Sequence, residues 1–210
     1  MNEKFYALSE EKQSQILNAA YKVFATNQYK KASTSEIAAE AGISKSLLFH
    51  YFHNKQELYI FLWKQAAALT KKYMCKYKVY ETDDFFEMMR RGLMAKCAVM
   101  RKYTFLSLFS INSYFETDPD IQSIIQPDVH DAAQTTMELL LSILNLDLIR
   151  KDVEFVRIYK EILYASDGML KYWYRTGNYD VTAFEQEYLE MINHWETVYG
   201  KGTENDGKQL

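Results

Sequence analysis

Residues that break helices are scarce in this chain of 210 residues. It contains only 7 glycines and 2 prolines, whereas residues that favour helices, such as alanine, leucine, glutamate and lysine, are plentiful. Hydrophobic residues make up 48% and charged residues 25%, which is too apolar for a disordered chain. We therefore predict an all-α fold of about nine helices.

Long apolar runs and cysteine clusters are also missing. No segment approaches the roughly 18 apolar residues that span a bilayer, and the first residues lack the apolar stretch of a signal peptide. We therefore expect a cytoplasmic protein with no membrane partner. Cys75 and Cys97 are too few for a disulfide framework and too far apart for a CxxC site, so we interpret both as buried or inert thiols.

Arginine and aspartate are absent from the first 78 residues, which hold 12 lysines and 6 glutamates. The whole chain has 25 basic and 28 acidic residues, so residues 79–210 hold 13 basic and 22 acidic ones. The amino-terminal part, residues 1–78, therefore has a formal charge of +6, and the remainder has −9. A basic amino-terminal part attracts the phosphates of DNA, whereas an acidic remainder is repelled by them. A solvated lysine face would give the same charge pattern, so a motif is needed to decide between the two.

Apolar residues at spacings of three and four predict a helix over residues 9–26. Ser33 and Glu36 have the spacing of a capping box, in which the two side chains bond each other's backbone N–H groups at a helix start. A short helix should follow over 34–41. Gly42 then ends this helix, because glycine adopts the left-handed conformation without steric cost.

Ser44 is expected to cap a third helix over 45–51, so that a helix, a glycine turn and a second helix follow one another. The apolar side chains that can form the core of this unit are Ile37, Ala38, Ala41, Ile43, Leu47 and Leu48. The residues that remain outward on the second helix are Lys45, Ser46, Phe49 and His50. Such a helix enters a major groove about 12 Å wide, where its side chains meet base edges and phosphates.

The remaining helices follow from capping residues and apolar periodicity. They are expected over about 55–77, from Asp83 or Asp84 to Met100, over 103–115, from Pro119 with a restart at Pro127 through Leu144, after a cap at Asp152 as far as Gly177, and over 182–199. The tail 201–210 is polar and glycine-rich and is predicted to be disordered.

The segment from Ser33 to Leu58 resembles the DNA-binding domain of the TetR family. That family's motif has a threonine, an Ile-Ala pair, an Ala-Gly-Val-Ser turn, a short helix ending in Tyr-x-x-Phe, and a Lys-x-x-Leu. The matching residues here are Ser33, Ile37, Ala38, Ala41, Gly42, Ile43, Ser44, Phe49, Phe52, Lys55 and Leu58. The resemblance implies that Ser33 and Lys55 bind phosphate. It also implies that bases face Lys45, Ser46 and His50.

One position departs from the family pattern. Phe49 stands where the family usually has tyrosine, whose hydroxyl would hold a phosphate. Phe49 can offer only an apolar contact, for example with a thymine methyl group. We therefore expect Tyr51 to take over the polar role.

The resemblance also implies how the chain is organised. A DNA-binding domain covers 1–54, and a larger helical domain over 55–200 binds an effector and dimerises. Dimerisation is carried over to Val153–Tyr174 and Thr182–Tyr199, because a helix-turn-helix needs two half-sites about 34 Å apart on a palindromic operator. The implied function is a homodimeric repressor that a small, largely apolar or aromatic effector releases from its operator.

Aromatic residues and methionines are numerous, with 17 Tyr, 12 Phe, 3 Trp and 9 Met. Such side chains suit a cavity for a loosely specified hydrophobic ligand. The candidate lining residues are Phe105, Phe109, Tyr114, Tyr159, Tyr164, Met169 and Trp173. Each of these residues, taken singly, is better explained by core packing than by a pocket. The prediction of a pocket therefore depends chiefly on the family resemblance.

No catalytic motif or metal-ligand set stands out, and no cofactor is expected. His50 and His53 have a spacing that metal ligands can have, but no cysteine or carboxylate nearby completes a set. The paired aspartates fit helix caps: Asp83 with Asp84, and Asp118 with Asp120. Two other functions stay open. One is an enzyme or carrier on a helical scaffold, and the other is a ligand-independent regulator or an activator that works through a protein partner.

Overall fold

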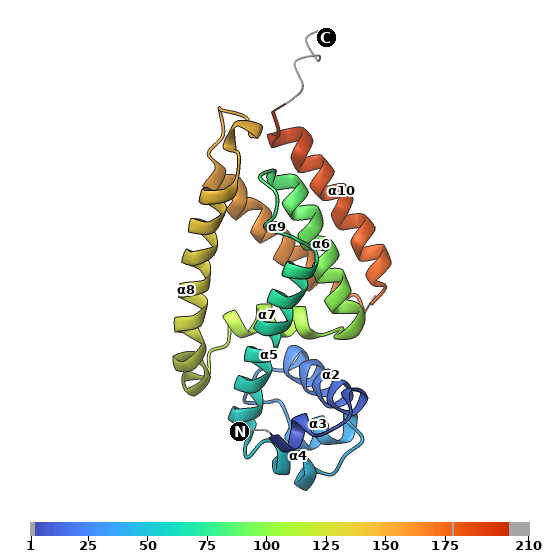
Figure 1. Cartoon of the computed structure of the whole chain (residues 1–210). Coiled ribbons are helices and arrows are strands. Elements are labelled where there is room, and N and C mark those ends of the chain that lie inside the picture. Colours follow the sequence, from blue (N-terminus) through green and yellow to red (C-terminus); the bar gives the residue numbers. More distant parts are fainter. Residues whose placement is uncertain (1–2, 178, 202–210) are drawn as a thin grey trace. The chain divides into compact units, whose positions relative to one another are not determined.

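The computed structural model describes residues 3–177 and 179–201, which form ten α-helices, one short 3-10 helix and no strand (Figure 1). The predicted all-α fold is confirmed. The elements are α1 (Glu3–Tyr6), α2 (Glu10–Thr26), α3 (Thr34–Glu40), α4 (Lys45–Tyr51), α5 (Lys55–Lys76), α6 (Phe85–Lys102), α7 (Leu106–Tyr114), α8 (Pro119–Ile143), the 3-10 helix Leu146–Leu148, α9 (Phe155–Arg175) and α10 (Val181–Tyr199).

The predicted serine caps are confirmed by their hydrogen bonds. The Ser33 hydroxyl accepts the backbone N–H of Glu36 at 3.4 Å, and the Ser44 hydroxyl accepts that of Leu47 at 3.1 Å. Each bond satisfies one of the N–H groups that a helix start leaves without an intrahelical acceptor. The bounds of α3 and α4 therefore follow from local sequence.

Three predictions about helix boundaries are wrong. α8 runs without interruption through Pro127, whose exposed position lets water reach the backbone group that lost its partner. Asp152 does not cap α9, because its carboxylate pairs with Arg150 at 2.6 Å and Glu154 stands at the cap position instead. α7 begins at Leu106, three residues after the predicted start, and α1 was not predicted at all.

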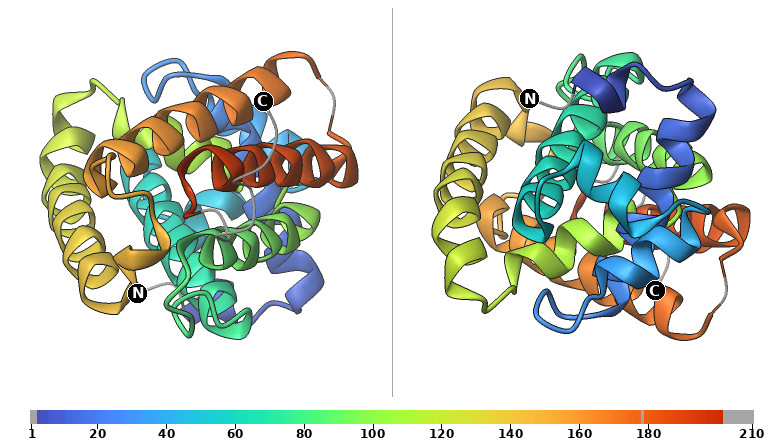
Figure 2. Two further views of the ribbon diagram at one scale, coloured as in Figure 1. Left: turned by 90° about the horizontal axis from the view of Figure 1, so that it is seen from above. Right: turned by 90° about the horizontal axis from the view of Figure 1, so that it is seen from below.

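The described chain divides into two compact units. The first comprises the residues up to Lys72 together with Ala98–Thr135, and the second comprises Tyr73–Cys97 and the residues from Thr136 onward. In the first unit α2 packs against α3 and α7, α3 against α4, and α1 against α4. The blue to cyan ribbons of α2, α3 and α4 can be followed in the right-hand view of Figure 2. Its largest fully buried side chains include Phe5, Tyr21, Phe52, Phe109 and Ile37.

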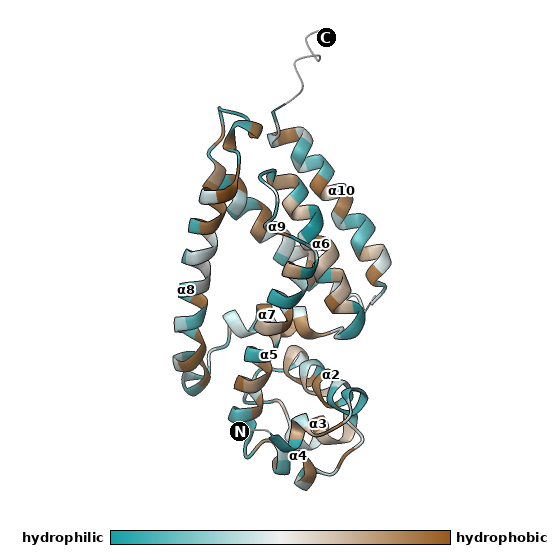
Figure 3. Ribbon diagram, in the orientation of Figure 1, coloured by the Kyte–Doolittle hydropathy of each residue, from teal (hydrophilic) through white to brown (hydrophobic). Residues whose placement is uncertain are grey.

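The second unit buries one face of each amphipathic helix. Along α10, apolar and polar residues alternate in the way that a helix with one buried face requires (Figure 3). Phe184 and Ile192 of α10 are fully buried, as is Leu170 of α9. Cys97 of α6 is buried as predicted, whereas Cys75 is exposed.

No helix among the described residues is long and apolar enough to cross a bilayer. The predicted division after residue 54 falls in the short connection between α4 and α5 and stays a prediction about function. The predicted disordered tail corresponds to residues that, apart from Lys201, lie outside the described ranges.

Candidate nucleic-acid interface

The segment from α3 to α4 is a helix-turn-helix whose inner face is closed by small and aliphatic side chains. Ile37, Ala38, Ala41 and Leu48 are buried to 2% exposure or less. Leu47, predicted as core, is instead 36% exposed. Its place on the outer face of α4 adds an apolar side chain to the surface that the prediction assigned to polar contacts.

Gly42 makes the turn between the two helices. Its φ is +59°, the left-handed region in which a side chain is unfavourable. The turn is closed by backbone bonds from the Gly42 N–H to the Ala39 carbonyl at 3.0 Å and from the Ile43 N–H to the Ala38 carbonyl at 2.9 Å. The turn predicted from one glycine is confirmed.

Five of the predicted DNA-contact residues lie exposed on this motif: Ser33, Ser44, Lys45, Ser46 and His50. Phe49 is half-buried, and the Lys45 ammonium lies 5.9 Å from the centre of its ring. The hydroxyls of Ser44 and Ser46 are 2.9 Å apart and share a hydrogen bond. The outer face of α4 thus presents a cation, hydroxyls, an imidazole and an aromatic edge, which are groups able to contact phosphates and base edges.

Tyr51 is placed differently from the expectation. Its side chain is 8% exposed, and its ring meets the ring of Phe5 of α1 at 6.3 Å. Because most of the ring is covered, Tyr51 serves the core of the first unit and is not a surface replacement for the missing family tyrosine. The short helix α1, which no sequence signal announced, supplies the side chain that covers it.

Lys55 is half-buried and directs its ammonium group at the loop between α2 and α3. The Nζ atom donates to the carbonyls of Tyr29 at 2.8 Å, Lys30 at 3.3 Å and Ala32 at 3.3 Å. It also lies 4.5 Å from the centre of the Tyr29 ring. The geometry therefore gives Lys55 backbone partners at the place where the family resemblance implies a phosphate.

The imidazole of His53 pairs with an acidic side chain. The Nδ1 atom of His53, in the connection between α4 and α5, lies 2.8 Å from Oε2 of Glu57 in the first turn of α5. Among the described residues no three histidine, cysteine or acidic side chains come together as a metal site. The pair is therefore a surface contact between the α4–α5 connection and the start of α5.

In the first unit, two of the predicted pocket residues have opposite environments. Phe109 is fully buried in an aromatic cluster, 5.3 Å from Tyr21 and 5.0 Å from Tyr59 between ring centres. Tyr114 is 43% exposed and packs edge-on against Trp63 at 5.6 Å. Phe105, which is half-buried, precedes α7. Phe109 is thus a core residue of this unit.

The predicted pocket residues in the second unit all lie on α9 but differ in exposure. Trp173 is buried against Phe184 at 5.2 Å, and its Nε1 atom has no hydrogen-bond partner. Tyr164 is 68% exposed, whereas Tyr159 and Met169 are half-buried. A hollow of about 460 Å³ lies along α9, but Tyr164 is the only predicted residue among those that line it.

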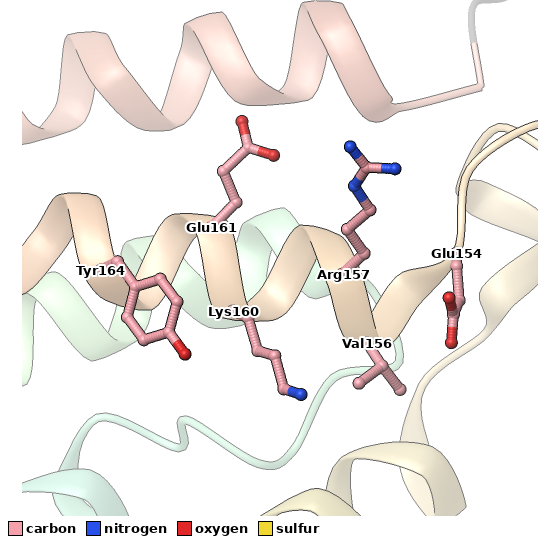
Figure 4. A pocket seen from close by; sticks show the side chains of 6 residues that line it. All are labelled: Glu154, Val156, Arg157, Lys160, Glu161 and Tyr164. Carbon is pink, nitrogen blue, oxygen red and sulfur yellow. The ribbon is translucent and has the colours of Figure 1, made fainter.

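The side chains around this hollow come from one helix and the residue before it, and most are charged. Figure 4 shows Arg157 and Glu161 pointing to one side of α9 and Lys160 and Val156 to the other. Glu161 accepts a hydrogen bond of 2.7 Å from the hydroxyl of Tyr199. Pockets for apolar ligands are concave and mostly apolar, so this hollow differs from the predicted effector pocket.

Polar groups inside the two units carry shifted pKa values that the sequence pattern does not reveal. Burial raises the pKa of Tyr59 to about 12, although its hydrogen bond with Ser113 acts in the opposite direction. In the second unit, burial lowers the pKa of Lys96 on α6 and raises that of Asp167 on α9, and the attraction between the two charges offsets part of each shift. In the sequence, such groups can be recognised only as polar residues within an otherwise apolar helix face.

An amino-terminal helix-turn-helix with an exposed, polar second helix defines a DNA-binding protein. Comparison with known proteins agrees with this class. Residues 16–60 match the model of the family described as bacterial regulatory proteins, tetR family. The chain is also 28% identical over 166 residues to the fatty acid metabolism regulator protein of Bacillus subtilis, an alignment that covers 79% of this chain and 70% of that protein.

Solved structures support the same fold. The fatty acid degradation regulator FadR of Bacillus halodurans has a TM-score of 0.61 at 19% identity, covering 88% of this chain and 96% of that one. FadR of Bacillus subtilis, solved in complex with stearoyl-CoA, has a TM-score of 0.57 at 18% identity and covers 85% and 96%. The family resemblance is confirmed. Through its amino-terminal segment this chain is thus similar to DNA-binding transcriptional regulators of the TetR family.

Proposed function

We propose that this protein is a homodimeric repressor that releases a palindromic operator when it binds a fatty acyl thioester. The observation that carries the proposal is the outer face of α4. There Lys45, Ser46 and His50 are exposed on a helix whose opposite side is closed by buried Ala38, Ala41 and Leu48. We assign base contacts to these three exposed residues. Ser33 and Ser44, at the starts of α3 and α4, are assigned to phosphates.

The effector class is proposed from the relatives. A protein 28% identical to this chain is named a fatty acid metabolism regulator, and a solved structure of the same fold contains stearoyl-CoA. A long acyl chain is largely apolar, which agrees with the predicted effector. The second unit supplies aromatic and aliphatic side chains for such a ligand, with Trp173 offering a buried N–H donor that has no partner.

Dimerisation is proposed through α9 and α10. Tyr164 and Tyr172 lie two helical turns apart on α9 with exposed fractions of 68% and 59%. Gly168 lies between them on the same face, and a Cβ built there meets nothing within 4 Å. Leu189 of α10 is a further exposed apolar side chain, at 39%. Exposed aromatic side chains around a residue without a side chain suit the close approach of a second helix.

The experiment that tests the function begins with selection of bound sequences from a random duplex pool. We expect an inverted repeat whose affinity falls steeply with salt concentration, because phosphate contacts release counterions. Stearoyl-CoA added to the complex should release the DNA, whereas coenzyme A alone, which lacks the acyl chain, serves as the matched control. Recovery of no enriched sequence from the folded protein would refute the DNA-binding part of the proposal. Release by neither compound would refute the effector class alone.

A further inference from the structure

The ammonium group of Lys55 is fully used by the backbone of its own protein. A lysine ammonium has three N–H donors and no acceptor. Three carbonyl oxygens, those of Tyr29, Lys30 and Ala32, lie within 3.3 Å of its Nζ atom. A direct hydrogen bond to a DNA phosphate would therefore require at least one of these bonds to break.

The loop that Lys55 holds leads directly into the recognition motif. It joins the end of α2 at Thr26 to Ser33, whose hydroxyl caps α3. The loop closes on itself through bonds from the N–H groups of Lys31 and Ala32 to the Gln28 carbonyl, at 2.9 and 3.0 Å. Because the Lys55 ammonium binds three carbonyls of this loop just before Ser33, it fixes the position at which α3 begins.

The same loop is held from its other side by an acidic residue. Oε2 of Glu116, in the connection between α7 and α8, accepts the backbone N–H of Tyr29 at 3.0 Å. Its Oε1 accepts the N–H groups of Thr117 at 2.9 Å and Asp118 at 3.0 Å. The backbone of Tyr29 thus donates its N–H to the Glu116 carboxylate and accepts at its carbonyl from the Lys55 ammonium. All of these residues belong to the first unit.

Packing around the Tyr29 side chain completes this arrangement. Its ring lies over the Lys55 ammonium and meets the Tyr59 ring edge-on at 5.3 Å and the Phe24 ring in a stack at 6.2 Å. Lys55 and Tyr59 are one turn apart on α5, so the start of this helix is joined to the loop by both charge and aromatic contact. We define Lys55, Glu116 and Tyr29 as the loop clamp.

We propose that Lys55 and Glu116 are positioning residues of the DNA-binding motif: they place the start of α3 for DNA through the loop clamp, and Lys55 neutralises no phosphate. The inference rests on the proposed DNA binding. It assigns to Lys55 a role different from the one that the family resemblance implies. It also assigns a role in DNA affinity to Glu116, a residue outside the helix-turn-helix.

The salt dependence of DNA binding separates the two roles of Lys55. Each neutralised phosphate contributes about 0.9 to the slope of log K against log salt concentration, so a dimer that loses one phosphate contact per protomer loses about 1.8. Lys55→Met keeps the length of the side chain and removes its charge. We expect a roughly tenfold weaker binding at every salt concentration, with an unchanged slope. Lys45→Met is the matched control: it removes a charge from the exposed face of α4 that we assign to base contacts, so it should lower the slope and also change the base preference.

Glu116 provides the second variant. Glu116→Gln has a single acceptor oxygen in place of the two that serve three N–H groups, so the clamp loses at least one of its bonds. We expect weaker DNA binding, and a loss in the double variant smaller than the two single losses combined, because both residues act on one loop. Amide hydrogen exchange should quicken over residues 27–40 in each variant and stay unchanged in α10, which a general loss of stability would not produce.

A slope that falls by about 1.8 in Lys55→Met would overturn the inference and make Lys55 a phosphate ligand. Wild-type affinity in Glu116→Gln, or strictly additive losses in the double variant, would overturn it as well. In both cases the wild-type protein still binds its operator, so the proposed function stands. A wild-type protein that binds no DNA sequence would overturn the function and this inference together.

Discussion

Gly42 offers a test of how backbone conformation sets the stability of the recognition motif. Its φ of +59° is a conformation that costs a residue with a side chain roughly 1–2 kcal/mol. A Cβ there would lie 3.4 Å from Nε2 of Gln15, an ordinary contact with a flexible side chain, so no clash adds to this cost. Alanine restricts the unfolded chain, which offsets roughly 0.4–1 kcal/mol. Gly42→Ala should therefore lower the free energy of unfolding by about 1 kcal/mol.

Gly92 is the matched control for this substitution. It lies inside α6, where a Cβ would meet Val79 at 4.0 Å, and alanine is the better helix former by roughly 0.8–1.0 kcal/mol. Thermal unfolding followed by circular dichroism should therefore shift in opposite directions for the two variants, by about 2–4 °C per kcal/mol in a chain of this size. If Gly42→Ala melts at or above the temperature of the wild type, the reasoning from φ is refuted.

Three further predictions concern the buried hydroxyl, the buried acid and the proposed dimer. Tyr21→Phe removes a bond of 3.2 Å from a fully buried hydroxyl to the Leu62 carbonyl and should lower the free energy of unfolding by about 1 kcal/mol; an unchanged denaturation midpoint would contradict this. Burial raises the folded-state pKa of Asp167 above its ordinary 3.8, so its stabilising effect is present at low pH and is lost as pH rises through the raised value. The stability of the wild type relative to Asp167→Asn should accordingly fall with rising pH on the acidic side of neutrality, and a flat difference between the two would be inconsistent with burial. Tyr172→Glu should shift the protein toward monomer in sedimentation velocity, whereas Leu141→Glu, at a 46% exposed site on α8, should not; equal sedimentation of both variants would argue against the α9 interface.

The helix starts and stops of the recognition motif were predictable because their causes are local. Ser33 and Ser44 cap their helices through bonds to residues three positions on. Gly42 turns the chain through its own φ, as Gly177 does after α9 with a φ of +72°. These interactions involve neighbours in the sequence, so spacing alone reveals them.

The wrong predictions have both local and distant causes. Asp152 has the residue type of a cap, yet Arg150 takes its carboxylate, and Pro127 has the residue type of a helix start, yet α8 continues through it. Tyr51 was expected to take over a polar role, but Phe5 of α1 covers its ring, and no local sequence pattern reveals this contact. Only for Tyr51 does packing against a distant segment override the local expectation, because the Arg150–Asp152 pair is formed by near neighbours in the sequence.

The amino-acid sequence by itself determined the all-α class, the helix-turn-helix and the family resemblance of the amino-terminal segment, because capping, periodicity and a dense motif act over a few residues. Only the tertiary structure decided what the motif's side chains contact. Lys55 is 23 to 26 residues from the carbonyls it holds, and Glu116 is 87 residues from the Tyr29 N–H. Hydrogen bonds between residues so far apart form when packing brings the two segments within about 3 Å, and no local pattern encodes that approach.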